Sequence, residues 1–120
     1  MRLHSGVDLV AISRVAGLDE AALNGVFTPG ELRHCAGQPA SLAGHWAAKE
    51  AMLKALGLGV DSAPMVGVEV VTQGSGMPAL VLSGAVLERA LALGVGELSV
   101  SISHDAGFAV AMVVALAQDD

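Results

Sequence analysis

The last part of the chain contains two strand patterns whose connection is too short for anything except a hairpin. Residues 97–103, ELSVSIS, alternate strictly and place Leu98, Val100 and Ile102 on one face. Residues 107–116, GFAVAMVVAL, form an apolar run typical of a buried strand. Parallel strands need a crossover of a dozen or more residues, so the short HDAG turn requires antiparallel pairing. The chain must therefore build an antiparallel sheet.

A second hairpin and several helices are predicted before this pair. The glycine-rich turn QGSGMP separates two more strand patterns, and helical periodicity fills the other segments. Strands are expected at 3–10, 66–72 and 79–83, and helices after Ser13, after Thr28, at 42–56 and at 84–94. This order predicts an α+β fold, with helices packed on one side of an antiparallel sheet. The length of 120 residues fits a single domain over 1–120.

Local signals define two of the helix ends. In TPGEL, Thr28 is an N-cap, Pro29 takes the first helical position and Glu31 the third. Ser41 opens the helix 42–56, and Gly57 closes it. Gly17 makes the helix after Ser13 short or irregular.

Composition excludes several classes of protein. The net charge is −6 and no run of Lys or Arg exists, which argues against nucleic-acid binding. The lone Cys35 excludes an internal disulfide and suits a reducing compartment. Asp8 interrupts the apolar stretch that a signal peptide would need near the N-terminus. The apolar run 108–117 is far shorter than the roughly 20 residues of a membrane helix. We expect a cytoplasmic protein. Its 53% hydrophobic content favours oligomerisation.

Both lysines of the chain lie around one glutamate, in HWAAKEAMLKALG. Glu50 and Lys54 are four residues apart and share a helix face. Lys49 directly precedes Glu50 and lies on the neighbouring face of the same helix. The simplest interpretation is a surface ion pair worth a few tenths of a kcal/mol. The alternative is a site in which the small neighbouring residues leave room for a ligand.

Two further polar residues interrupt apolar strands. Asp8 lies in GVDLV, where it either points to solvent while Val7 and Leu9 point inward, or is buried with a partner or metal. His104 follows SVSIS, where it either caps local backbone groups or reaches a ligand.

Together these residues suggest a metal site. Two isolated carboxylates, Asp8 and Glu50, are the usual protein contribution to Mg²⁺, with phosphate oxygens and water as the remaining ligands. Adjacent lysines neutralise phosphate as point charges. The sequence thus predicts a Mg²⁺-dependent enzyme for a phosphate or pyrophosphate substrate. It is no P-loop protein, because GSGMP lacks the required Lys and Ser/Thr.

Several blocks of the sequence resemble those of a known family. GVDLVAISR, LAGHWAAKEAMLKALGLG and LSVSISHDAGFAVAMVV resemble the three signature blocks of the holo-acyl-carrier-protein synthases, the small 4′-phosphopantetheinyl transferases. FTPGEL and GSGMPALVLSG resemble the intervening blocks. The resemblance implies the 4′-phosphopantetheinyl transferase fold and a homotrimer whose active sites lie at subunit interfaces.

The resemblance also implies a reaction. Coenzyme A is the co-substrate and Mg²⁺ the cofactor, and Mn²⁺ also suits such oxygen ligands. A serine of an apo acyl carrier protein, or of a fatty-acid or polyketide synthase carrier domain, receives 4′-phosphopantetheine. Adenosine 3′,5′-bisphosphate leaves.

Residue roles follow by matching the motifs. Asp8 and Glu50 match the metal ligands, and Glu50, directly or through a water, is a candidate base for the serine. Lys54 matches the phosphate-contacting lysine, and with Asp8 and Glu50 makes up the expected catalytic set. The remaining matches are Lys49, in the same block as Lys54; His104 and His45, near the coenzyme A phosphates; and Arg14, which contacts the acidic carrier protein.

Departures from the family pattern keep an alternative open. His45-Trp46 stands where Arg-Phe is usual, and basic residues are missing near Gly25 and at Met77. A neutral histidine serves phosphate less well than arginine. The alternative is a non-catalytic trimeric homologue that binds carrier protein but has weakened affinity for coenzyme A. A third possibility is an unrelated Mg²⁺-dependent phosphohydrolase.

Overall fold

The computed structural model describes residues 1–59 and 64–118. Three long strands form one antiparallel sheet in the order β1-β5-β4. These strands are β1 (Arg2–Ala11), β4 (Val95–Asp105) and β5 (Phe108–Ala117). A separate antiparallel hairpin joins β2 (Val68–Thr72) to β3 (Pro78–Leu82). Both hairpins predicted from the sequence are therefore confirmed.

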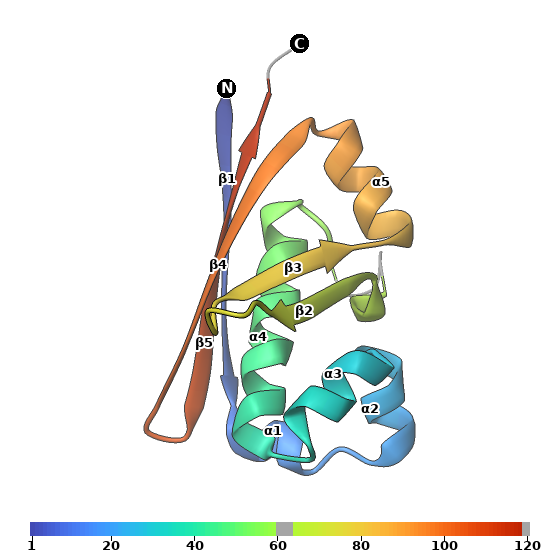
Figure 1. Cartoon of the computed structure of the whole chain (residues 1–120), viewed down its shortest axis with the longest axis vertical. Coiled ribbons are helices and arrows are strands. Elements are labelled where there is room, and N and C mark those ends of the chain that lie inside the picture. The colour runs from blue at the N-terminus through green and yellow to red at the C-terminus, as the bar shows by residue number, and fades with distance from the viewer. Residues whose placement is uncertain (60–63, 119–120) are drawn as a thin grey trace.

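All helices lie on one side of the three-stranded sheet. Figure 1 shows α4 packed on one face of that sheet, with the remaining helices and the β2–β3 hairpin on the same side. The helices are α1 (Ile12–Ala16), α2 (Glu20–Val26), α3 (Pro29–Cys35), α4 (Pro39–Ala55), the 3₁₀ turn η1 (Met65–Gly67) and α5 (Gly84–Ala92). The expected α+β fold is confirmed. None of these helices, within the described residues, is long and apolar enough to cross a membrane.

Several element ends differ from the sequence prediction. The irregular helix expected around Gly17 is two helices, and the Asp19 side chain caps the second by accepting from Ala22 N. Helix α4 begins at Pro39, three residues early, since proline is well suited to a first helical turn. Strand β4 continues through His104 to Asp105, so that histidine lies on a strand and not in the turn. The capping box of Thr28 and Glu31 is present as expected.

Small residues bring α4 directly onto the sheet. Ala43, Ala47 and Ala51 of the helix are fully or almost fully buried against it. A Cβ atom added to Gly6 of β1 would lie 1.9 Å from the carbonyl oxygen of Ala51. Strand β1 and helix α4 therefore touch through their backbones. This contact fixes how the side chains of β1 are placed relative to those of α4, including Asp8 relative to Glu50.

The opposite face of the sheet is apolar and uncovered in the described chain. Leu3, Val7 and Leu9 of β1 are 74%, 56% and 63% exposed. Met112 of the central strand β5 pairs with Val7 and is 51% exposed. Figure 1 shows no described element over this face. Such a contiguous apolar surface is typical of a protein interface.

Candidate functional site

The structure decides between the two orientations of Asp8. Its side chain points inward toward α4 and the residue is 8% exposed, whereas Val7 and Leu9 face out. The solvent-facing alternative is therefore wrong. Glu50 of α4 is half-buried, and its pKa responds to the Asp8 charge, so the two carboxyl groups are close neighbours.

Lys54 contacts the Asp8 carboxylate. Its Nζ donates to Asp8 Oδ1 at 3.1 Å and to the carbonyl oxygen of Val7 at 3.0 Å. The lysine side chain is still 54% exposed, so it can reach a second anion. The simple Glu50–Lys54 surface pair is not what the structure shows, since the ion pair of Lys54 is with Asp8.

The carboxylate pair lacks part of the positive charge that would balance it. Asp8 Oδ2 is buried without a hydrogen-bond partner. Burial raises the pKa of Glu50, and the Asp8 charge raises it further, while Arg14 opposes the rise. A divalent cation would relieve both the unpaired oxygen and the repulsion. The two carboxylates thus fit a Mg²⁺ ion. The described residues hold no cluster of three potential ligands, so substrate and water would have to complete its coordination.

Arg14 and Trp46 flank this pair. The guanidinium carbon of Arg14 lies 5.2 Å from the centre of the Trp46 ring, within cation–π range. The indole N–H of Trp46 is turned toward Glu50, where it opposes the rise in pKa, but it does not reach hydrogen-bond geometry. Arg14 is exposed. It is therefore a surface cation held next to the carboxylates.

Lys49 does not belong to this site. Its side chain is fully buried, and its Nζ donates to Glu31 Oε1 at 2.6 Å and to the carbonyl oxygen of Val68. Burial lowers the pKa of Lys49, and the charge of Glu31 opposes that change. The expectation that Lys49 neutralises phosphate does not fit this placement, because the ammonium group has no access to solvent.

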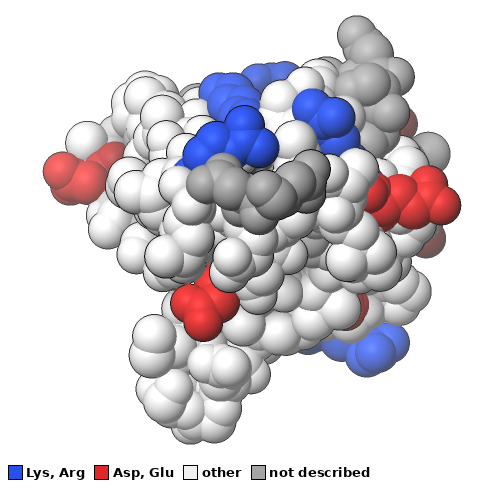
Figure 2. Space-filling model, turned by 90° about the horizontal axis from the view of Figure 1, so that it is seen from above, with Lys and Arg blue, Asp and Glu red and all other residues white. Residues whose placement is uncertain are grey.

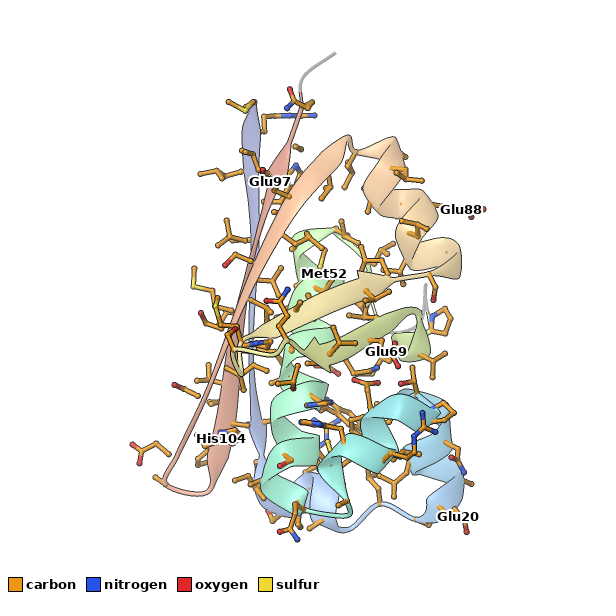
Figure 3. All side chains as sticks on the ribbon, in the orientation of Figure 1. Glu20, Met52, Glu69, Glu88, Glu97 and His104 are labelled. Atoms are coloured by element: carbon orange, nitrogen blue, oxygen red, sulfur yellow. The ribbon has the colours of Figure 1, made fainter. Side chains whose placement is uncertain are left out.

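Three histidines line a pocket elsewhere. His34 of α3, His45 of α4 and His104 of β4 border a cavity of about 480 Å³. Figure 3 shows His104 on β4, level with the first turns of α4. Its Nε2 lies 2.8 Å from the carbonyl oxygen of Ala40. A Cβ atom on Gly44 would lie 2.9 Å from that nitrogen, so glycine is needed for the close approach.

The carboxylate pair and the histidine pocket occupy different sides of one chain. Asp8 lies on β1 and His104 on β4, which are the two edges of the sheet. Helix α4 lies between them, and neither Asp8, Glu50 nor Lys54 lines the pocket. The structure thus brings Asp8, Glu50, Lys54 and Arg14 together, and His45 and His104 together, but keeps these two groups apart.

Sequence reasoning missed two residues. Glu31 was identified only as a helix cap, yet it is the buried partner of Lys49 and His45. His34 was not singled out at all, although its ring stacks on that of His45 with the centroids 5.7 Å apart. Both follow Thr28 within one short helix, and no spacing signal links them to the helix 42–56.

Comparisons with known proteins agree on one family. A family model described as the 4′-phosphopantetheinyl transferase superfamily matches residues 5–113. A holo-[acyl-carrier-protein] synthase from Dehalococcoides mccartyi is 39% identical over 117 residues, covering 94% of this chain and 98% of the relative. A fatty acid synthase subunit alpha from Aspergillus oryzae is 42% identical over 115 residues, covering 92% of this chain but 6% of that protein.

A solved structure shares the fold over the whole chain. The complex of a Chronobacterium ammoniagenes ACPS with CoA has a TM-score of 0.87 and 34% sequence identity. The match covers 99% of this chain and 100% of that one. The fold expected from the signature blocks is therefore confirmed.

The buried lysine gives a prediction about stability. Lys49→Met should lower the free energy of unfolding by about 3–5 kcal/mol, because Glu31 would remain buried without its cation. The measurement is urea unfolding followed by the fluorescence of Trp46, the single tryptophan. Lys54→Met is the comparison variant and should cost clearly less than Lys49→Met, since the ammonium group it removes is on a side chain that is 54% exposed. Equal losses in the two variants would contradict the structural role of Lys49.

Proposed function

The chain belongs to the 4′-phosphopantetheinyl transferase superfamily, and from this we propose that it transfers 4′-phosphopantetheine from coenzyme A to a serine of an apo acyl carrier protein. The observation that carries the proposal is the inward-facing Asp8 beside Glu50, with Lys54 at its open side. Two carboxylates and an accessible lysine suit a metal-bound pyrophosphate. The chain is thus a holo-[acyl-carrier-protein] synthase in this proposal.

In this proposal each residue at the carboxylate pair has a defined task. Asp8 and Glu50 would hold Mg²⁺, which when bound supplies charge neutralisation for the pyrophosphate. Lys54, already oriented by Asp8 and by the Val7 carbonyl oxygen, donates to a phosphate oxygen on which negative charge develops. Glu50 accepts the proton of the attacking serine hydroxyl.

The reaction balances without a further reactant. The serine oxygen bonds to the phosphorus next to pantetheine, and the bond from that phosphorus to the bridging pyrophosphate oxygen breaks. The products are the carrier phosphodiester and adenosine 3′,5′-bisphosphate. The hydroxyl proton leaves to the base. Because the substrate provides both phosphates, the protein has to position the groups, stabilise charge and accept the hydroxyl proton.

The complete site would combine two subunits. The carboxylate pair and the histidine pocket lie at opposite edges of the sheet in one chain. A homotrimer can place the β1 edge of one subunit against the pocket of the next, so that one coenzyme A spans both. The exposed apolar residues Leu3, Val7, Leu9 and Met112 supply a surface that such an assembly would bury.

The partner is a carrier protein or a carrier domain of a fatty-acid or polyketide synthase. The similarity to a fatty acid synthase subunit, a much longer protein, supports this class of partner. Arg14 is an exposed cation next to the carboxylates and would contact an acidic carrier. In the end view of Figure 2 most of the surface is uncharged, and several Lys and Arg side chains gather on one part of it.

The first test is intact-protein mass spectrometry with coenzyme A, Mg²⁺ and a panel of apo carriers. A carrier should gain one phosphopantetheine, and EDTA should prevent it. Asp8→Asn and Glu50→Gln should abolish the gain, and Lys54→Met should slow it roughly 100-fold or more. Glu88→Gln, which changes a carboxylate on the remote helix α5, is the matched control.

The outcomes separate the alternatives. Unchanged transfer by Asp8→Asn or Glu50→Gln would refute the metal assignment. No transfer to any carrier together with no binding of coenzyme A would favour the non-catalytic homologue. Turnover of coenzyme A without a carrier would favour the phosphohydrolase.

Arg14 is predicted to act on the carrier. Arg14→Ala should raise the KM for carrier protein several-fold and leave the KM for coenzyme A nearly unchanged, because a rim cation mainly affects protein docking. Steady-state kinetics with each substrate varied in turn provides the measurement. Arg33→Ala on α3 is a matched loss of one exposed arginine. An effect confined to the KM for coenzyme A would place Arg14 at the nucleotide instead.

The assembly is predicted to depend on the uncovered sheet face. Sedimentation equilibrium should give about three times the chain mass of 12.0 kDa. Met112→Glu should dissociate the trimer, because it places a charge in the centre of the apolar face. Leu91→Glu on α5, at a residue that is 65% exposed, should leave it intact. A wild-type monomer at micromolar concentration would remove the shared site.

A further inference from the structure

One buried hydrogen-bond donor next to the carboxylate pair has no acceptor. Trp46 is only 8% exposed, and its indole nitrogen is buried without a hydrogen-bond partner among the described residues. A buried indole N–H usually finds an acceptor, because an unpaired donor in the interior costs free energy. The surroundings of the ring show which acceptor this donor could take.

The ring of Trp46 is packed on two sides. The Phe27 ring lies against it, with the two centroids 6.3 Å apart and the planes inclined at 60°. The guanidinium carbon of Arg14, on α1, lies 5.2 Å from the centre of the Trp46 ring. A tilted aromatic neighbour and a cation over the ring both favour a defined ring orientation. The direction of the indole N–H is therefore set by packing.

Glu50 is the acceptor toward which this N–H is turned. The two residues are four apart on α4 and share a face of that helix. Burial and the Asp8 charge raise the pKa of Glu50, whereas the indole N–H opposes this rise, because a donor favours the ionised carboxylate. The two groups still fall short of hydrogen-bond geometry. Because the indole is packed, it is the half-buried Glu50 side chain that would have to move to complete the bond.

A divalent cation provides a reason for such a movement. Asp8 repels Glu50 electrostatically, and Asp8 Oδ2 has no hydrogen-bond partner among the described residues. A cation shared by the two carboxylates would replace this repulsion with attraction. A carboxylate has two oxygens, so a cation can take one while an N–H donates to the other. Carboxylates that ligate metals commonly accept such a hydrogen bond, which fixes their orientation.

We propose that the indole N–H of Trp46 donates to one oxygen of the Glu50 carboxylate when a divalent cation binds the other oxygen, which makes Trp46 a positioning residue of the metal site. The inference rests on the proposed function, in which Asp8 and Glu50 hold Mg²⁺. The buried indole nitrogen faces protein and not solvent, so its acceptor is Glu50 and not the substrate. The inference also gives a role to a departure from the family pattern, because the usual phenylalanine has no donor.

Nuclear magnetic resonance tests the hydrogen bond directly, because the single tryptophan gives one indole ¹H–¹⁵N signal. Spectra of the assembled protein are compared with coenzyme A and EDTA, and with coenzyme A and Mg²⁺, so that only the cation differs. Mg²⁺ should move the indole proton signal downfield and slow its exchange with solvent, since the N–H gains a charged acceptor. An unchanged shift and exchange rate at saturating Mg²⁺ would overturn the proposal.

Two replacements of Trp46 remove the N–H and keep an aromatic ring. One is Trp46→Phe, and the other is benzothienylalanine at the same position, whose ring has nearly the shape of indole but carries sulfur in place of the N–H. Each should raise the Kd for Mg²⁺ about tenfold, measured by isothermal titration of the complex with coenzyme A. The kcat at saturating Mg²⁺ should change less, because the bound cation itself still aligns Glu50. Wild-type affinity for Mg²⁺ in the benzothienylalanine protein would overturn the proposal.

Phe27→Leu is the matched control for packing. It alters a fully buried ring that contacts Trp46 but leaves the indole N–H in place. This variant should unfold at a lower urea concentration than wild type and keep an affinity for Mg²⁺ close to that of wild type. An equal loss of Mg²⁺ affinity in Phe27→Leu and in the benzothienylalanine protein would assign the effect to packing around the ring and overturn the role of the N–H.

Failure of this inference is distinguishable from failure of the proposed function. Carrier modification by the wild type, together with Mg²⁺ affinity that does not depend on the indole N–H, would refute the role of Trp46 and leave the transferase intact. Absence of Mg²⁺ binding to the wild type, both with and without coenzyme A, would refute the metal assignment and this inference together.

Discussion

The buried carboxylate of Glu31 is the interaction on which the arrangement around α4 depends. Oε1 accepts from the Thr28 backbone N–H and from Lys49, and Oε2 accepts from the Val70 backbone N–H and faces His45. Burial alone would raise the pKa of Glu31, but the His45 hydrogen bond and the charge of Lys49 hold it below its ordinary value. One ionised group thus joins α3, β2 and α4. Removing one partner of a buried charge is strongly destabilising, so this carboxylate couples the positions of the three elements.

Helix α4 carries residues of two separate surfaces. Trp46, Glu50 and Lys54 follow one another at intervals of four; Glu50 and Lys54 lie toward Asp8 of β1, and Trp46 toward Arg14 of α1. His45 and Lys49 form the neighbouring row and lie toward α3 and β2. Adjacent residues in the chain therefore serve different surfaces. Because the helix is rigid and contacts β1 backbone to backbone at Gly6, the spacing between the two surfaces is fixed within each subunit.

Much of this could be predicted from the sequence, for definite physical reasons. Alternation identified the strands, the HDAG turn required the antiparallel pairing, and the Thr28–Glu31 box located the start of α3. Alternation could not say which face of β1 is covered, so the orientation of Asp8 stayed open until the position of α4 was known.

The lysine pair marks another limit of sequence reasoning. Spacing along a helix tells which residues share a side, but not what packs against that side. The different surroundings of Lys49 and Lys54 are set by Glu31, a residue 18 positions before Lys49 in the chain. His34 was missed for a related reason, since its link to His45 exists only across the α3–α4 contact.

The unequal burial of the two lysines also determines how the protein reacts with reagents that modify amines. The chain has no other lysine, and the ammonium of Lys49 is sealed in the interior. Apart from the N-terminal amine, an electrophile that attacks amines therefore finds a single accessible target, Lys54, at the edge of the carboxylate pair. The native sequence thus carries one accessible lysine beside its proposed catalytic groups, to which, along with the N-terminal amine, a fluorophore or crosslinker could be attached without mutagenesis.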